Sequence, residues 1–142
     1  MNKNFQLLQT NWLQHQKELS QVRREVFINE QKVPEALEWD EFDKTSLHIL
    51  VLNEQQKPIA TGRLKNDGQI GRMAVIKNYR KQGIGSAILK TLINHASQQH
   101  YPTLYLHAQL SAVNFYQKFN FKVYGNKFMD AGIAHQSMQL TK

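Results

Sequence analysis

The chain has 142 residues, of which 41% are hydrophobic and 20% charged, so its size suits one globular domain spanning residues 1–142. It contains no cysteine, which excludes a disulfide framework, a thiolate nucleophile and a cysteine-based metal site. Its formal net charge of +7 favours an anionic partner, a condition that nucleic acid, a membrane surface and a polyphosphate cofactor all meet.

The predicted elements begin with a short strand at residues 5–9. From Asn11 the apolar residues recur at helical spacing, and Pro34 ends this segment or opens a second short helix as its first residue. The following stretch, residues 35–43, holds five of the eleven acidic residues and is expected to form a turn or helix. It is either a solvated loop or a surface that attracts a cationic substrate.

Three strands in succession are predicted next, because compact apolar segments alternate with turn signals. These strands are residues 47–52, 59–64 and 69–76, and Asn66-Asp67-Gly68 is a strong hairpin signal between the last two. Cations gather from the second strand onward, so we expect a basic face there; they are Arg63, Lys65, Arg72, Lys77, Arg80 and Lys81.

The second half of the chain alternates helices with strands. The expected elements are a helix at 84–99, a strand at 104–108, a short helix with Ser111 as its N-cap, and strands at 121–124 and 137–140 joined through Ala131-Gly132. This order predicts an α/β fold with a mixed sheet. No apolar run approaches the roughly 18 residues of a membrane span, and the N-terminus is too polar for a signal peptide. We therefore expect a cytoplasmic protein that contacts no membrane.

The segment Arg80-Lys81-Gln82-Gly83-Ile84-Gly85 lies between a predicted strand and a predicted helix. No GxxxxGK[ST] string exists in the chain, which excludes a P-loop. A dinucleotide fingerprint fails because Ile88 replaces the third glycine and Tyr105 lies near the place of the expected acid. The pattern [RQ]xxGx[GA] matches at every fixed position.

This segment has the physical properties of a diphosphate site. Amides at a helix start have no partner within the helix, the helix dipole adds positive charge, and glycines allow a phosphate to approach the backbone. Ser86 continues this helix start. The alternative is a glycine turn that only begins a helix.

Two further motifs accompany the loop. Arg72-Met73-Ala74-Val75 precedes it, and Ala112-Val113-Asn114-Phe115-Tyr116 is followed by Phe119-Asn120-Phe121. Together they resemble the GCN5-related N-acetyltransferase (GNAT) superfamily over most of the chain. The sequence is most similar to the ElaA/YjcF-like group through residues 24–31, Glu38-x-Asp40, His48 and residues 132–138. Asn120 replaces the glycine that the family favours, and Asp130 replaces a frequent glutamate.

The resemblance implies a GNAT-like (acyl-CoA N-acyltransferase) fold, in which helices flank a twisted, mostly antiparallel mixed sheet. It also implies that acetyl-CoA is the co-substrate and that an amine attacks it directly in a ternary complex. Amides around Ala74 and Val75 are expected to polarise the thioester carbonyl. The predicted cofactor-binding residues are Met73, Ala74, Val75, Arg80, Lys81, Gln82, Gly83, Ile84, Gly85, Ser86, Asn114 and Tyr116.

Tyr116 matches the frequent general acid of the family, since a phenol stays protonated at neutral pH and can protonate a thiolate. The alternative for Tyr116 is a core aromatic. Glu30 is the predicted general base, on an element that resembles the acceptor-side helix of relatives. His48, His107, His135 and a water chain remain open alternatives.

The sequence therefore predicts an N-acetyltransferase, monomeric or homodimeric, that needs no metal and acts on a small-molecule or peptide amine. A different acyl-CoA donor is a variant of this prediction. The alternatives are a non-catalytic CoA-binding or regulatory domain and, on charge alone, a nucleic-acid binder. No helix carries a basic stripe, so we expect no nucleic-acid partner.

Overall fold

The computed structural model describes residues 4–141, and its elements follow the predicted order of strands and helices. They are β1 (Gln6–Thr10), α1 (Trp12–Arg23), the π-helix η1 (Arg24–Glu30), α2 (Glu35–Glu38), the 3-10 helix η2 (Glu41–Lys44), β2 (Leu47–Leu52), β3 (Pro58–Leu64), β4 (Ile70–Val75), the 3-10 helix η3 (Lys77–Tyr79), α3 (Ile84–Gln98), β5 (Thr103–Gln109), the 3-10 helix η4 (Leu110–Ala112), α4 (Val113–Gln117), β6 (Lys122–Asp130) and β7 (Ile133–Thr141).

The strands form two antiparallel sheets, in the orders β1-β2-β3-β4 and β5-β7-β6. Between β4 and β5 the described residues form one parallel bridge, Gln69–Tyr105, next to which the Tyr105 amide donates to the Gly68 carbonyl at 3.1 Å. Beyond that bridge the two strands are not paired, so the sheets are joined at one end and open at the other. The predicted fold class is confirmed.

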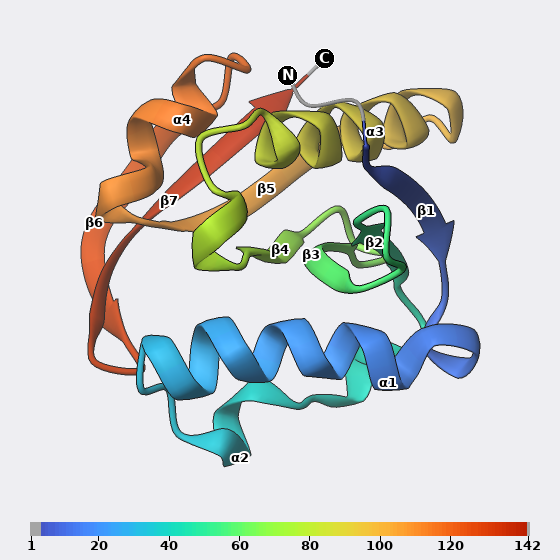
Figure 1. Ribbon diagram of the computed structural model, residues 1–142. Coiled ribbons are helices and arrows are strands. Elements are labelled where there is room, and N and C mark those ends of the chain that lie inside the picture. The colour runs from blue at the N-terminus through green and yellow to red at the C-terminus, as the bar shows by residue number, and fades with distance from the viewer. Residues whose placement is uncertain (1–3, 142) are drawn as a thin grey trace.

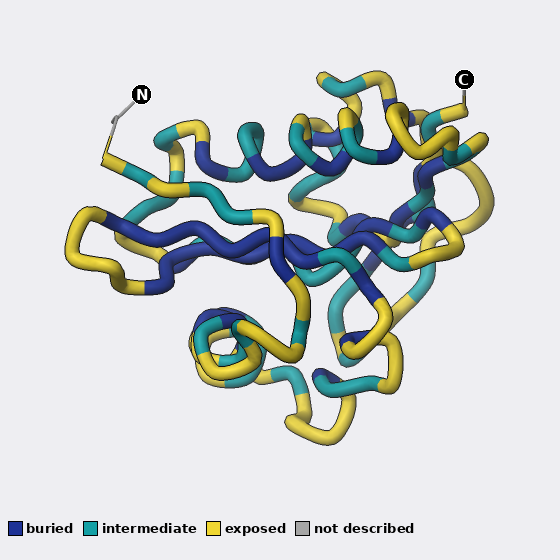
Figure 2. Tube along the Cα trace, turned by 90° about the vertical axis from the view of Figure 1, so that its right-hand side faces the viewer, coloured by how far each residue is buried: buried dark blue, intermediate teal, exposed yellow. Residues whose placement is uncertain are grey.

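Helices cover both faces of the four-stranded sheet, α1 on one side and α3 on the other (Figure 1). Figure 2 shows the strands as a buried layer between them. Ile88 and Leu92 of α3 are fully buried, one turn apart, and share the main core with Val22 of α1, whereas Leu19 of α1 packs in a second cluster with Leu50 and Leu52 of β2. Among residues 4–141 no helix is long and apolar enough to cross a membrane.

Backbone geometry corrects two local predictions and shows how Asn120 replaces the glycine that the family favours. Ser111 is not an N-cap, because it lies within η4, and α4 begins after Ala112 without a side-chain cap. Pro34 immediately precedes α2 and is not its first helical residue. Asn120 has a φ of 72°, so it adopts the left-handed conformation for which glycine is usual.

The final hairpin is longer than predicted, since β6 and β7 have nine residues each. The turn at Ala131-Gly132 has positive φ at both residues, as a tight hairpin requires. A register shift in β6 lies between Tyr124 and Phe128, and the Gln136 amide donates to the carbonyls of Tyr124 and Gly125 there. Nearly all of β6 is exposed, and its second half has no alternation of apolar and polar residues, which explains why the predicted strand ended at Tyr124.

Candidate active site

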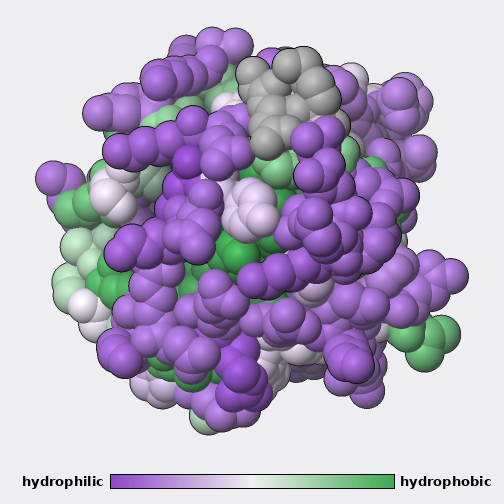
Figure 3. Space-filling view, viewed as in Figure 1, coloured by the Kyte–Doolittle hydropathy of each residue, from purple (hydrophilic) through white to green (hydrophobic). Residues whose placement is uncertain are grey.

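A cleft of about 250 Å³ lies where β4 and β5 separate. Its walls come from both sheets, from η1, α2 and the segment between them, and from Ala112 and Tyr116 of η4 and α4. In the orientation of Figure 1, Figure 3 shows hydrophobic side chains in recesses of a largely hydrophilic face. The polar side chains that line the cleft are Gln31, Glu38, Gln69, Arg72, His107, Gln109, Asp130 and His135.

A bulge in β4 shapes one wall of this cleft. The pairing of β3 with β4 shifts by one residue between Thr61 and Arg63, and Arg72 adopts a φ of 51°. Thr61 Oγ1 donates to the Arg72 carbonyl at 2.9 Å, which holds the bulge. Opposite it, a Cβ on Gly62 would lie 2.5 Å from Ile88 Cγ2, so α3 packs directly on the bare backbone. The bulge turns Arg72 and Met73 toward the cleft.

Beyond the bulge, β4 presents backbone groups away from β3. The Ile76 amide donates to the Ile59 carbonyl at 3.0 Å. Because amides alternate in direction along an antiparallel strand, the Val75 amide points away from β3. The Val75 carbonyl also points away from β3, because it accepts a hydrogen bond from Arg80 Nε at 2.8 Å. At the end of β4, one backbone donor is therefore free for a ligand.

The glycine loop leads directly into α3. Lys81 and Gly83 have φ values of 64° and 85°, and Gly83 precedes the helix without a side-chain cap. The first helical bond of this turn runs from the Ala87 amide to the Gly83 carbonyl, so the three amides before Ala87 lack helical partners. A Cβ on Gly85 would touch the Phe115 ring at 3.6 Å, which places α4 beside the loop. This geometry fits a diphosphate.

Arg80 is held by two neighbours. Besides its bond to Val75, its Nη1 and Nη2 pair with both carboxylate oxygens of Glu30, at 2.8 and 2.6 Å. The hydrogen bond from Arg80 lowers the pKa of Glu30. Glu30 is not among the residues that line the cleft. Its role as general base therefore stays a prediction that this geometry does not favour.

Tyr116 lines the cleft and also packs in the core, so both interpretations of this residue apply. Its ring contacts Phe115 and Phe121 at centroid distances of 5.0 and 6.0 Å, and it is 8% exposed. Burial raises its pKa to about 12. Within residues 4–141 its hydroxyl has no hydrogen-bond partner, and it is not a fully buried atom. The hydroxyl therefore opens onto the cleft, whereas Asn114, two residues earlier in α4, is exposed.

The histidines fall into two groups. His48 is buried outside the cleft, where its Nε2 lies 2.8 Å from the Asp43 carbonyl and burial lowers its pKa. His107 and His135 line the cleft on either side of Phe128, with ring centroids 5.3 and 5.7 Å from it. Partial burial lowers the pKa of His107. In residues 4–141, no group of three or more histidine, aspartate or glutamate side chains is arranged for a metal.

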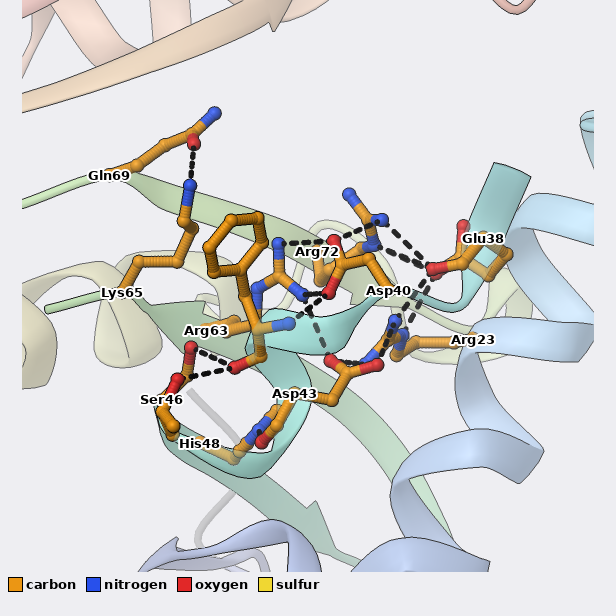
Figure 4. A network of polar contacts seen from close by, with 12 residues as sticks. Arg23, Glu38, Asp40, Asp43, Ser46, His48, Arg63, Lys65, Gln69 and Arg72 are labelled. Atoms are coloured by element: carbon orange, nitrogen blue, oxygen red, sulfur yellow. Dashed lines mark hydrogen bonds and ion pairs between the residues drawn. The ribbon is translucent and has the colours of Figure 1, made fainter. Parts of the chain in front are cut away.

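The acidic stretch is neither a solvated loop nor a free anionic surface. Its carboxylates Glu38, Asp40 and Asp43 pair with three arginines, Arg23, Arg63 and Arg72, in a charge network (Figure 4). Arg63 and Arg72 therefore do not belong to a basic cofactor face, and that part of the charge prediction is wrong. Sequence reasoning missed the network, although acids that alternate with Trp39 and Phe42 were a signal of a packed segment.

Two antiparallel sheets that diverge around a polar cleft, with a glycine loop at a helix start, define an acyl-CoA N-acyltransferase fold. The chain matches the acetyltransferase (GNAT) domain over residues 14–142, and it belongs to that family. It is 40% identical over 121 residues to the uncharacterized N-acetyltransferase YjcF of Bacillus subtilis (strain 168), covering 82% of this chain and 86% of the relative.

Solved structures agree with this assignment. Escherichia coli ElaA matches with a TM-score of 0.82 and 26% identity over 95% of this chain and 97% of its own. An acyl-CoA N-acyltransferase from Pseudomonas aeruginosa has the same fold, with a TM-score of 0.85 and 24% identity over 95% of this chain and 98% of its own. A GNAT family acetyltransferase from Elizabethkingia anophelis with acetyl-CoA bound shares the fold at a TM-score of 0.71 and 14% identity, over 99% and 100% of the two chains.

Proposed function

We propose that this chain is a cytoplasmic N-acetyltransferase, which transfers the acetyl group of acetyl-CoA to a primary amine bound in the β4–β5 cleft. The observation that carries the proposal is that three features lie on elements packed beside the diverging strands β4 and β5. The helix start at the glycine loop has no side-chain cap, so its amides can bind the diphosphate of the cofactor. The Val75 amide points away from β3 and can donate to the thioester oxygen, and the Tyr116 hydroxyl opens onto the cleft.

Each group has a role in direct transfer. The neutral amine attacks the thioester carbonyl carbon, and the Val75 amide donates to the oxygen on which negative charge develops. As the C–S bond breaks, Tyr116 donates its proton to the leaving thiolate, and a proton from the amine restores the phenol. The other proton of the original ammonium leaves to solvent. A pKa of about 12 keeps Tyr116 protonated at neutral pH for this role.

The acceptor proton leaves through a group in the cleft. Of the alternatives that the sequence left open, His107 and His135 line the cleft, whereas His48 and Glu30 do not. The lowered pKa of His107 keeps this ring neutral near pH 7, so it can accept a proton. We propose one of these two rings, or a water beside them, as the route.

The experiment is a screen of amines scored by the release of free thiol from acetyl-CoA. Tyr116→Phe is expected to lower kcat about 100-fold or more while acetyl-CoA still binds. Tyr124→Phe is the matched control, because Tyr124 lies exposed on β6 outside the cleft. Binding of acetyl-CoA without acetylation of any amine in a broad panel would instead identify a CoA-binding regulatory domain and contradict the proposal.

A further inference from the structure

The charge network meets the cleft at two residues, Glu38 of α2 and Arg72 of β4. The other four charged members, Arg23, Asp40, Asp43 and Arg63, are not among the cleft-lining residues. Figure 4 shows Glu38 and Arg72 at the edge of the network that faces away from His48. Any ligand in the cleft therefore meets the network through these two side chains.

Glu38 uses one carboxylate oxygen for the network and leaves the other free. Oε2 lies 2.8 Å from Arg23 Nε and 3.1 Å from Arg72 Nε. Within residues 4–141, Oε1 accepts no hydrogen bond, although the side chain is 4% exposed. In this part of the chain, only Arg63 Nε is both fully buried and without a hydrogen-bond partner. Glu38 Oε1 is therefore not fully buried, and it reaches the cleft surface.

Arg72 leaves one nitrogen free in the same way. Its Nη2 donates to the Glu38 carbonyl at 2.8 Å and to Asp40 Oδ2 at 3.2 Å, and its Nε contacts Glu38 as described. In the described part of the chain, Nη1 has no hydrogen-bond partner, and it too is not a fully buried atom. The cleft thus contains one free carboxylate oxygen and one free guanidinium nitrogen on directly paired groups.

The formal charges of the network cancel, because three arginines pair with three carboxylates. A ligand with a single charge satisfies one free atom and leaves the other desolvated without a partner, which is unfavourable. A ligand with both charges satisfies both atoms without adding net charge. Since the Glu38 carboxylate and Arg72 are in direct contact at 3.1 Å, the two charges of the ligand must lie close together.

We propose that the amine acceptor is a small zwitterion, an amine with an anionic group close to it, as in an α-amino acid. Glu38 Oε1 binds the amino group, and Arg72 Nη1 binds the anionic group. The apolar lining by Phe27, Val33 and Leu37 suits an apolar side chain on such an acceptor. This substrate class rests on the proposed acetyl transfer for its biological meaning, but its binding does not depend on catalysis.

The test uses three ligands that differ by one charged group: leucine, 3-methylbutylamine without the carboxylate, and 4-methylpentanoate without the amine. Binding of each to the CoA-saturated protein is measured by backbone amide NMR shifts, and no acetyl group is present to react. Leucine is expected to bind about 10- to 100-fold more tightly than either analogue, the size of one charge-assisted hydrogen bond. Equal affinity for leucine and 3-methylbutylamine would overturn the proposal.

Two substitutions locate the effect. Arg72→Gln is expected to weaken leucine about 10-fold or more and to change 3-methylbutylamine less than about 2-fold. Arg24→Gln is the matched control, because Arg24 pairs with exposed Glu35 and lies outside both the network and the cleft lining, so the preference for leucine should survive. Weakening of both ligands alike by Arg72→Gln would overturn the proposal. If this variant does not fold, the wild-type series decides alone.

The same protein separates the two proposals. Tight leucine binding without thiol release from acetyl-CoA by any amine would contradict the acetyltransferase function and leave the zwitterion site standing. Conversely, efficient acetylation of amines without an anionic group, with no preference for leucine, would support the function and overturn the zwitterion site.

Discussion

The glycine loop and the charge network are two polar regions of this molecule, and they are built in opposite ways. The loop presents backbone amides, and its shape depends on Lys81, Gly83 and the start of α3, all within a few residues. The network consists of side chains from α1, α2, η2, β3 and β4 and the residues beside them. A local backbone site tolerates change elsewhere in the chain, whereas a network of buried charges depends on every member.

Loss of one buried charge is the strongest way to test this difference. Arg23→Met removes a fully buried guanidinium that pairs with Glu38 and Asp43, and leaves those carboxylates without compensation. We expect the free energy of unfolding to fall by about 3–5 kcal/mol, measured by urea denaturation. Arg24→Met, the exposed neighbour that pairs with Glu35, is the control and should barely shift the urea midpoint. Equal effects of the two changes would mean that the network is not a structural unit.

A backbone change in the loop should have a smaller and more local effect. Gly83→Ala places a Cβ at a φ of 85°, which costs about 1–2 kcal/mol. Because the loop must shift to relieve this strain, acetyl-CoA affinity should fall about 10-fold, measured by calorimetry. Gly125→Ala, with a φ of 71° in open space on β6, should cost comparable stability without any change in acetyl-CoA affinity. Reduced affinity in both variants would contradict a local cofactor site.

Burial of His48 against the Asp43 carbonyl, beside the network, should also make stability depend on pH. Its folded pKa is lowered by burial, so the unfolded chain binds the proton more readily. Stability is then fully present above the unfolded pKa of about 6.5 and is lost as the pH falls below it, by at most about 1.4 kcal/mol per pH unit. His48→Gln should flatten the difference between pH 7 and pH 5. An unchanged slope would show that His48 does not titrate as proposed.

The smallest expected effect is that of Glu30→Gln, which removes the exposed ion pair with Arg80. We expect a change of less than about 5-fold in both kcat and acetyl-CoA affinity, since exposed pairs contribute little. Steady-state kinetics with an acceptor from the screen would measure both. A fall in kcat of about 100-fold would restore Glu30 as the general base, against the position given to it by the structure.

The same contrast explains what the sequence could predict. The order of elements, the hairpin at Asn66-Asp67-Gly68 and the helix start within the glycine loop all depend on short-range patterns, and these predictions agree with the structure. Local signals also mislead, as at Ser111, where a 3-10 turn takes the place of a capped helix start.

The charge network beside the cleft could not be predicted in this way. Arg23 and Asp43 are 20 residues apart, and Arg63 reaches Asp40 across a similar separation. No periodicity indicates which carboxylate a given arginine will meet, because that depends on how α1 packs on β3 and β4. Composition suggested a basic face, yet four of the six gathered cations form ion pairs with acids, namely Arg63, Lys65, Arg72 and Arg80.

The most direct test of the central claim is a crystal structure of the protein with acetyl-CoA. We expect the diphosphate on the amides at the start of α3, the thioester oxygen within hydrogen-bond distance of the Val75 amide, and the sulfur next to the Tyr116 hydroxyl. An acetyl group bound away from the β4–β5 cleft, with Val75 and Tyr116 both remote from the thioester, would contradict the account.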